Sequence, residues 1–136
     1  MTAKKAAVML EYGVQEDRSR TMLEHAGYQP FFFTEPTYIL DSLDREYELF
    51  VLGVSCATHP YGPDRLVNGS PTFALIRDLQ GDDRARNKPI VIMSTYVHDS
   101  LYKEHIRGTG VPAVDIPYER EQLLAAIREA EEQCRV

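Results

Sequence analysis

The sequence predicts an α/β fold: one doubly wound sheet of five parallel strands, each followed by a helix, with right-handed crossovers. Two observations predict it. Short apolar runs recur along the chain, and each is too short for a helix and rich in β-branched or aromatic residues, as in strands buried on both faces of a parallel sheet. Between these runs the apolar residues recur at helical spacing, with glycine, proline or a polar cap at the segment ends.

The five apolar runs are the expected strands. They occupy residues 6–10, 31–33, 49–54, 89–93 and, less distinctly, 111–116. The expected helices lie at 15–26, 36–43, 71–80, 99–107 and 119–133. Gly27, Gly81 and Gly108 follow three of these helices, as terminating glycines do. The third helix is preceded by Ser70 as an N-cap and begins with Pro71 at its first position.

Length and composition indicate one globular domain, residues 1–136. A chain of 136 residues can close a hydrophobic core, and 43% hydrophobic with 26% charged residues is ordinary for such a domain. No apolar stretch approaches the roughly 20 residues of a membrane helix. The apolar run after Lys4 and Lys5 is too short for a secretory signal. We therefore expect a cytoplasmic protein with no membrane-spanning segment.

Charge and cysteine usage narrow the class of partner. The net charge of -6 disfavours direct nucleic-acid binding, because such binding rests on clustered lysine and arginine. Protein or small-molecule partners are expected instead. Cys56 and Cys134 lack Cys-x-x-Cys spacing, and the four histidines lack ligand spacing with cysteines or carboxylates. We expect reduced thiols, no disulfide framework and no metal site.

One connection is long for a loop between a strand and a helix. Segment 55–69 contains Pro60, Gly62 and Pro63 and closes with an Asn-Gly pair, a composition that excludes regular structure. It follows a central strand, and ligands of open α/β sheets bind beyond the carboxyl ends of the strands. A functional loop and a tolerated insertion are equally compatible with this segment.

Short stretches along nearly the whole chain carry a family resemblance. They are Glu11 at the end of the first strand, segment 23–29 with Ala26-Gly27-Tyr28, and segments 47–52, 88–94, 116–118 and 121–127. In order and spacing they resemble the receiver domain of two-component response regulators, a flavodoxin-like fold. The resemblance implies a strand-end pocket in which an acidic pair holds magnesium beside a phosphoacceptor aspartate, a hydroxyl and a lysine.

Most of these chemical groups are replaced at the matching positions. The positions are Glu11 and Tyr12 for the acidic pair, Gly53 for the acceptor, Ser94 for the hydroxyl and Ile116 for the lysine. A glycine has no side chain that could form an acyl phosphate, and no Asp or Glu stands elsewhere in that strand or directly after it. The sequence therefore predicts a degenerate receiver, a pseudo-receiver, that is not phosphorylated, holds no metal or other cofactor and is not an enzyme.

The resemblance also implies a switch and a partner surface. Ser94 matches the hydroxyl of the switch, but a short fifth strand puts Ala113 near the position of its aromatic residue. In receivers the face made by the fourth helix, the fifth strand and the fifth helix is the surface for dimers and partners. The candidates on that face are Tyr102, His105, Ile106 and Tyr118.

Three functions are compatible with the sequence. We favour a phosphorylation-independent signalling or adaptor module that works through protein contacts as a homodimer, with a histidine kinase or another regulator as partner. We also expect no output domain after residue 136, and therefore expect any effect to pass through that partner. One alternative is a small-molecule-sensing domain that uses the strand-end pocket under segment 55–69, with Ser55, Cys56, His59 and Asp64 as candidates. Another is an enzyme that uses Cys56 or His59, against the simpler interpretation of an ordinary thiol and a surface histidine.

Overall fold

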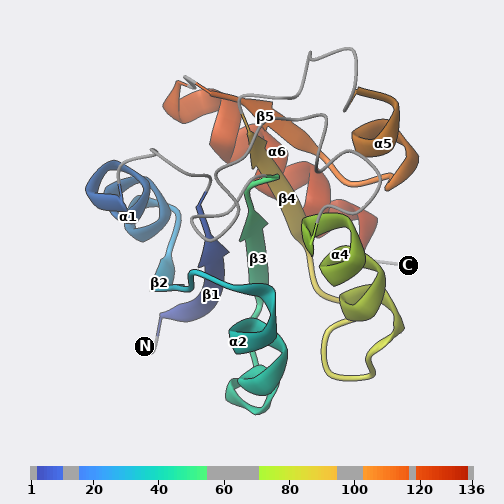
Figure 1. Ribbon diagram of the computed structural model, residues 1–136. Coiled ribbons are helices and arrows are strands. Elements are labelled where there is room, and N and C mark those ends of the chain that lie inside the picture. The colour runs from blue at the N-terminus through green and yellow to red at the C-terminus, as the bar shows by residue number, and fades with distance from the viewer. Residues whose placement is uncertain (1–2, 11–15, 55–70, 95–102, 117–118, 135–136) are drawn as a thin grey trace.

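The computed structural model describes residues 3–10, 16–54, 71–94, 103–116 and 119–134. Within them five parallel strands form one sheet in the order β2-β1-β3-β4-β5, which confirms the predicted fold class (Figure 1). The strands are β1 (Lys4–Met9), β2 (Tyr28–Phe32), β3 (Leu49–Leu52), β4 (Ile90–Ser94) and β5 (Ala113–Asp115). The helices are α1 (Glu16–His25), α2 (Pro36–Asp41), the 3-10 helix η1 (Leu43–Arg45), α4 (Pro71–Gly81), α5 (Lys103–Gly108) and α6 (Arg120–Gln133).

Helices cover both faces of the sheet, and each face has its own hydrophobic cluster. One cluster packs α2, α4 and α5 against the sheet through Ile39, Leu75, Ile76, Leu79 and Ile106. The other packs α1 and α6 through Leu23, Leu123, Ala126 and Ile127. Every residue of β3 and β4 is buried, because helices cover both faces and strands flank both sides. Side chains alternate between the faces, so Phe50 joins the first cluster and Val51 the second.

The second strand begins earlier than the sequence predicts, at Tyr28, and it includes Pro30. A proline lacks the N–H that a central strand needs, but β2 is an edge strand paired only with β1. The amide of Phe33 donates to the Val8 carbonyl at 2.8 Å. Since donors alternate along a strand, the nitrogen of Pro30 faces away from β1, where no hydrogen bond is required.

The predicted helix at 36–43 is two elements. Helix α2 ends at Asp41, and η1 follows it. The Ser42 hydroxyl donates to the Ile39 carbonyl at 3.0 Å, a local bond that competes with helix continuation. The first helix ends as expected: Gly27 has a φ of 92°, a conformation that favours glycine. Residues 99–102 of the expected fourth helix lie outside the described residues, and α5 is described from Lys103.

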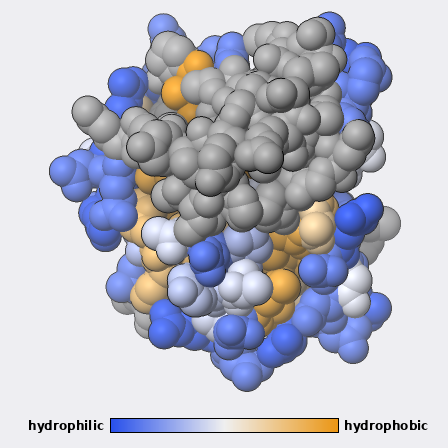
Figure 2. Space-filling model, in the orientation of Figure 1, coloured by the Kyte–Doolittle hydropathy of each residue, from blue (hydrophilic) through white to orange (hydrophobic). Residues whose placement is uncertain are grey.

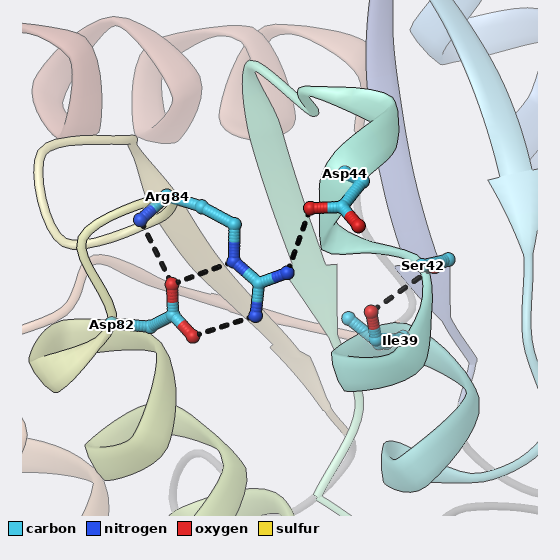
Figure 3. A network of polar contacts seen from close by, with 5 residues as sticks. All are labelled: Ile39, Ser42, Asp44, Asp82 and Arg84. Carbon is cyan, nitrogen blue, oxygen red and sulfur yellow. Dashed lines mark hydrogen bonds and ion pairs between the residues drawn. The ribbon is translucent and has the colours of Figure 1, made fainter.

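A polar network ties the two connections at the amino ends of the central strands (Figure 3). Arg84, in the turn after α4, bonds both oxygens of Asp82 at 3.1 and 3.0 Å, and its own amide donates to Asp82 at 2.8 Å. The same guanidinium reaches Asp44 of η1 at 2.9 Å. Arg84 therefore links the end of α4 to the element that follows α2.

No helix in the described ranges is long and apolar enough to cross a membrane.

Candidate functional site

The carboxyl ends of β3, β4 and β5 meet at one edge of the sheet. In the strand registers Leu52 lies opposite Ile92, and Ser94 lies opposite Asp115. The residues that end or follow these strands are therefore neighbours. Three of the five predicted pocket positions, Gly53, Ser94 and Ile116, stand at these ends.

Gly53 follows β3 and is buried. Its amide donates to the Met9 carbonyl at 2.7 Å, and its carbonyl accepts a 2.6 Å bond from the Thr72 hydroxyl. Both polar groups of this residue are thus bonded within the fold. At the position where the receiver pattern has a nucleophilic carboxylate, the chain has a backbone whose hydrogen bonds are already made.

Thr72 is a residue of this site that the sequence alone did not single out. It is the second residue of α4, 1% exposed, and its hydroxyl lies 2.6 Å from the Gly53 carbonyl and 3.2 Å from the Val54 carbonyl. It therefore attaches the start of α4 to the end of β3. The sequence did offer one signal, since Thr72 is a hydroxyl residue directly after the expected helix start at Ser70 and Pro71. At such a start, however, the hydroxyl of the N-cap residue is the one usually considered.

Ser94 is the last residue of β4 and is completely buried. Its carbonyl accepts from the amide of Ile116 at 3.1 Å, which holds the segment after β5 against the end of β4. A hydroxyl in this position is shielded from bulk water. It lies at the strand end where the receiver pattern has a hydroxyl.

Ile116 packs against the apolar cluster on the α1 and α6 face. An apolar side chain there makes favourable contacts, whereas an unpaired ammonium would lose its hydration. The preceding residue, Asp115, is half-buried, and it is the only carboxylate among the described residues that end or follow β3, β4 and β5. No motif in the sequence indicated Asp115.

At the described strand ends the chain offers a magnesium ion one carboxylate, Asp115, while both positions of the acidic pair lie outside the described residues. Such an ion takes several hard oxygen ligands, usually including carboxylates. Here the Gly53 carbonyl is engaged by Thr72, and Asp115 is a single carboxylate. Across the described ranges no group of three or more His, Cys, Asp or Glu side chains could hold a metal.

Eight of the predicted residues lie outside the described ranges. They are Glu11 and Tyr12 of the pocket, Ser55, Cys56, His59 and Asp64 of the 55–69 loop, and Tyr102 and Tyr118 of the partner face. Their predicted roles stay predictions.

Helix α5 supplies two of the residues predicted for the partner face, His105 and Ile106. His105 is exposed, and its ring stacks on Phe73 of α4 at a centroid distance of 5.7 Å. Ile106 is 4% exposed and belongs to the core, so its assignment to an accessible partner surface is wrong. The reason is helical geometry: adjacent residues point in different directions, and Ile106 is the one that faces the sheet. Ala113 is half-buried against the same cluster.

No family model matches the chain, and no curated protein matches it. Solved structures do. The signal receiver domain of a signal transduction histidine kinase from Syntrophus aciditrophicus matches with a TM-score of 0.74 and 16% identity, over 98% of this chain and 93% of that chain. A second match is the receiver domain of the sensor histidine kinase PA1611 from Pseudomonas aeruginosa PAO1, which has magnesium coordinated in its active-site cleft. Its TM-score is 0.73 and its sequence identity 13%, over 96% of this chain and 98% of that chain.

Full-length FixJ from B. japonicum matches with a TM-score of 0.70 and 22% identity, over 99% of this chain and 61% of that chain. These neighbours, together with the observed strand order, define the class at the level of fold. The chain has the CheY-like, flavodoxin-like α/β fold of response regulator receiver domains.

Proposed function

We propose that the chain is a phosphorylation-independent pseudo-receiver, a signalling or adaptor module of a two-component or related regulatory pathway. The observation that carries this proposal is Gly53. It stands where β3 ends, has no side chain, and has both backbone groups bonded to Met9 and Thr72. Transfer of a phosphoryl group to a receiver needs a carboxylate oxygen at this point, with cationic groups positioned to neutralise the charge.

The neighbouring residues support the same conclusion. Ile116 brings an apolar side chain into a cluster where the receiver pattern has an ammonium. Ser94 is fully buried, so its hydroxyl is a poor alternative acceptor. Asp115 remains as a carboxylate at the same edge, and it is the residue that a test must control for.

Protein contacts are the proposed output. The solved neighbours include receiver domains of histidine kinases and a full-length response regulator, and a histidine kinase or another regulator is the partner class that we propose. We also propose that the chain works as a homodimer. The net charge of -6 favours a protein partner over nucleic acid.

The direct test incubates the purified chain with acetyl phosphate and magnesium and measures its intact mass. We expect no added phosphate, while a receiver with the complete acidic set, treated in the same way, is modified. A stoichiometric, acid-labile phosphate on the chain would overturn the proposal. If phosphate appears, the Asp115→Asn variant shows whether that carboxylate accepts it.

The oligomeric state is tested separately by light scattering. We expect a mass of twice the 15.5 kDa chain, unchanged by acetyl phosphate and magnesium. A monomer at every concentration measured would contradict the homodimer and leave the phosphorylation result standing.

A further inference from the structure

An apolar groove lies between α2 and α4. Its volume is about 340 Å³. Leu40, Ala74 and Leu75 supply its floor, and Leu75 also belongs to the core. In Figure 2 this face shows hydrophobic surface between the two helices, bordered by hydrophilic residues.

Contacts on both sides hold the groove in shape. Ile39 of α2 and Leu79 of α4 are fully buried in one cluster, so both helices are anchored to the same sheet face. Beyond the groove, Arg84 joins the turn after α4 to Asp44 of η1 at 2.9 Å (Figure 3). A groove that exists before a ligand arrives costs less ordering free energy on binding.

The rim of the groove is acidic. Glu35 lines it at the start of α2 and Asp78 at the middle of α4. Neither carboxylate forms an ion pair within the part of the chain that the structure describes. The neighbouring Arg77 is not among the lining residues. A ligand would thus meet an apolar floor between two negative charges.

Helix α2 also carries the one exposed large hydrophobic side chain in the described ranges. Tyr38 is 53% exposed. Tyrosine is enriched at protein interfaces, where its ring supplies contact area at a low cost in side-chain entropy. Its position on the helix that forms one wall extends the candidate surface beyond the groove itself.

We propose that this groove, lined by Leu40, Ala74 and Leu75 between Glu35 and Asp78, docks an amphipathic helix of a partner protein. The helix would present aliphatic side chains at helical spacing, flanked by lysine or arginine. The apolar floor favours the aliphatic side chains, and the acidic rim favours the flanking lysine or arginine. A second copy of the chain fits less well, because a two-fold contact at this face would bring the two acidic rims together.

This proposal rests on the proposed adaptor function in one respect, that the output is a protein contact. It does not depend on whether the chain is phosphorylated. The acetyl phosphate assay and the binding assay below can therefore fail independently of each other.

The test titrates the isotope-labelled full chain with a helical peptide of about 15 residues, roughly four turns. The peptide carries leucines on one face and lysines beside them, and a matched peptide has glutamates in place of the lysines. We expect amide shifts confined to residues 35–41 and 74–78 with the lysine peptide. The glutamate peptide should bind at least about fivefold more weakly, since exposed charge pairs contribute up to about 1 kcal/mol each.

Two variants test whether the peptide binds in the groove, and each adds one positive charge. Thr37 lines the groove and is exposed, so Thr37→Arg should weaken binding of the lysine peptide by about tenfold through bulk and repulsion. Gln80 is exposed on α4 but does not line the groove, so Gln80→Arg should leave binding nearly unchanged. The spectrum of each free variant confirms that it is folded.

Several results would overturn the proposal. They are equal binding of both peptides, shifts at another face, equal effects of the two arginine variants, or no binding. Concentration-dependent shifts at 35–41 and 74–78 without peptide would assign the groove to a second copy of the chain and would overturn it as well.

Discussion

At the scale of single residues, the end of β3 depends on one buried hydroxyl. Thr72 donates to the carbonyls of Gly53 and Val54, which are both buried residues. A buried carbonyl without a donor is costly, and valine has nearly the shape of threonine without the hydroxyl. The bond therefore can be removed with little change in packing.

We expect Thr72→Val to lower the free energy of unfolding by about 1–3 kcal/mol, the usual cost of leaving a buried polar group unsatisfied. Urea denaturation followed by circular dichroism measures it. The matched control is Thr21→Val in α1, where an exposed hydroxyl bonds the Asp17 carbonyl at 3.1 Å; its effect should stay within about 0.5 kcal/mol. Equal effects of the two changes would show that Thr72 does not hold the strand end.

Tyr28, at the start of β2, is a second residue whose single hydrogen bond is expected to contribute to stability. Its side chain is 3% exposed, and its hydroxyl donates to the Glu131 carboxylate of α6 at 2.8 Å. Burial, followed by the bond and the charge of Glu131, raises the pKa of the Tyr28 phenol well above its ordinary value of 10.0. The fold therefore favours the neutral phenol.

This shift has a defined sign for stability. A pKa that is higher in the folded state gives a contribution that is complete below pH 10.0 and is lost as the pH rises above it. We expect Tyr28→Phe to cost about 1 kcal/mol at neutral pH, from the lost hydrogen bond. Urea denaturation across the alkaline range should show this difference shrinking above pH 10.0.

The control for this prediction is Tyr38→Phe, which changes an exposed hydroxyl. Its effect on the free energy of unfolding at neutral pH should be near zero. An alkaline ultraviolet titration adds a direct measurement, because the wild type should contain one more late-ionising tyrosine than Tyr28→Phe. A difference that grows above pH 10.0 would contradict the assigned sign.

At the scale of elements, η1 ends in an unfavourable backbone conformation. Glu46 follows it with φ 61° and ψ 58°, in the left-handed region that favours glycine. The Glu46 amide donates to the Leu43 carbonyl at 3.1 Å, which closes the turn and leads into β3. A side chain at this position keeps a steric penalty that the fold tolerates.

We expect Glu46→Gly to raise the free energy of unfolding by about 0.5–1 kcal/mol. Relief of the left-handed penalty outweighs the greater chain entropy of glycine in the unfolded state. Glu46→Ala is the matched control, since it removes the same carboxylate but keeps a Cβ; it should not stabilise. Thermal and urea denaturation measure both, and equal stabilisation by alanine and glycine would assign the effect to the lost charge.

Edge strand β2 shows how one element is protected on both faces. The guanidinium of Arg20 lies 4.8 Å from the Phe32 ring centroid, and that of Arg45 lies 5.7 Å from the Phe31 ring. Cations over aromatic rings cover apolar surface while their charge stays in water. With Pro30 removing an outward donor, these features reduce the tendency of the open edge to pair with another chain.

At the scale of the whole molecule, the strand order sets where the fold is most stable. Strands β1, β3 and β4 have neighbours on both sides, whereas β2 and β5 have one each. We expect the slowest hydrogen exchange at the amides of β3 and β4, which open only on global unfolding, and at least about tenfold faster exchange at β5. Exchange followed by NMR, with urea dependence as the control for global opening, measures this. Equal protection of β5 and β3 would contradict it.

Some features of the fold were readable in the sequence because they are local. The apolar runs predicted the strands, and Gly27 predicted the end of α1, since a short apolar run and a left-handed turn involve only neighbouring residues. Pro30 obscured the true start of β2, because a proline is tolerated inside a strand only at the edge of a sheet. Whether a strand lies at the edge depends on the strand order, which is a property of the complete sheet and cannot be read from neighbouring residues.

The sequence by itself determined the fold class and the chemical absence at Gly53, because an alternating pattern and a missing side chain require no partner to be recognised. Tertiary structure alone decided that Thr72 closes the end of β3, that Ile106 belongs to the core, and that an acidic-rimmed groove lies between α2 and α4. Each of these depends on contacts between residues far apart in the chain. Their geometry exists only once both clusters have packed on the sheet.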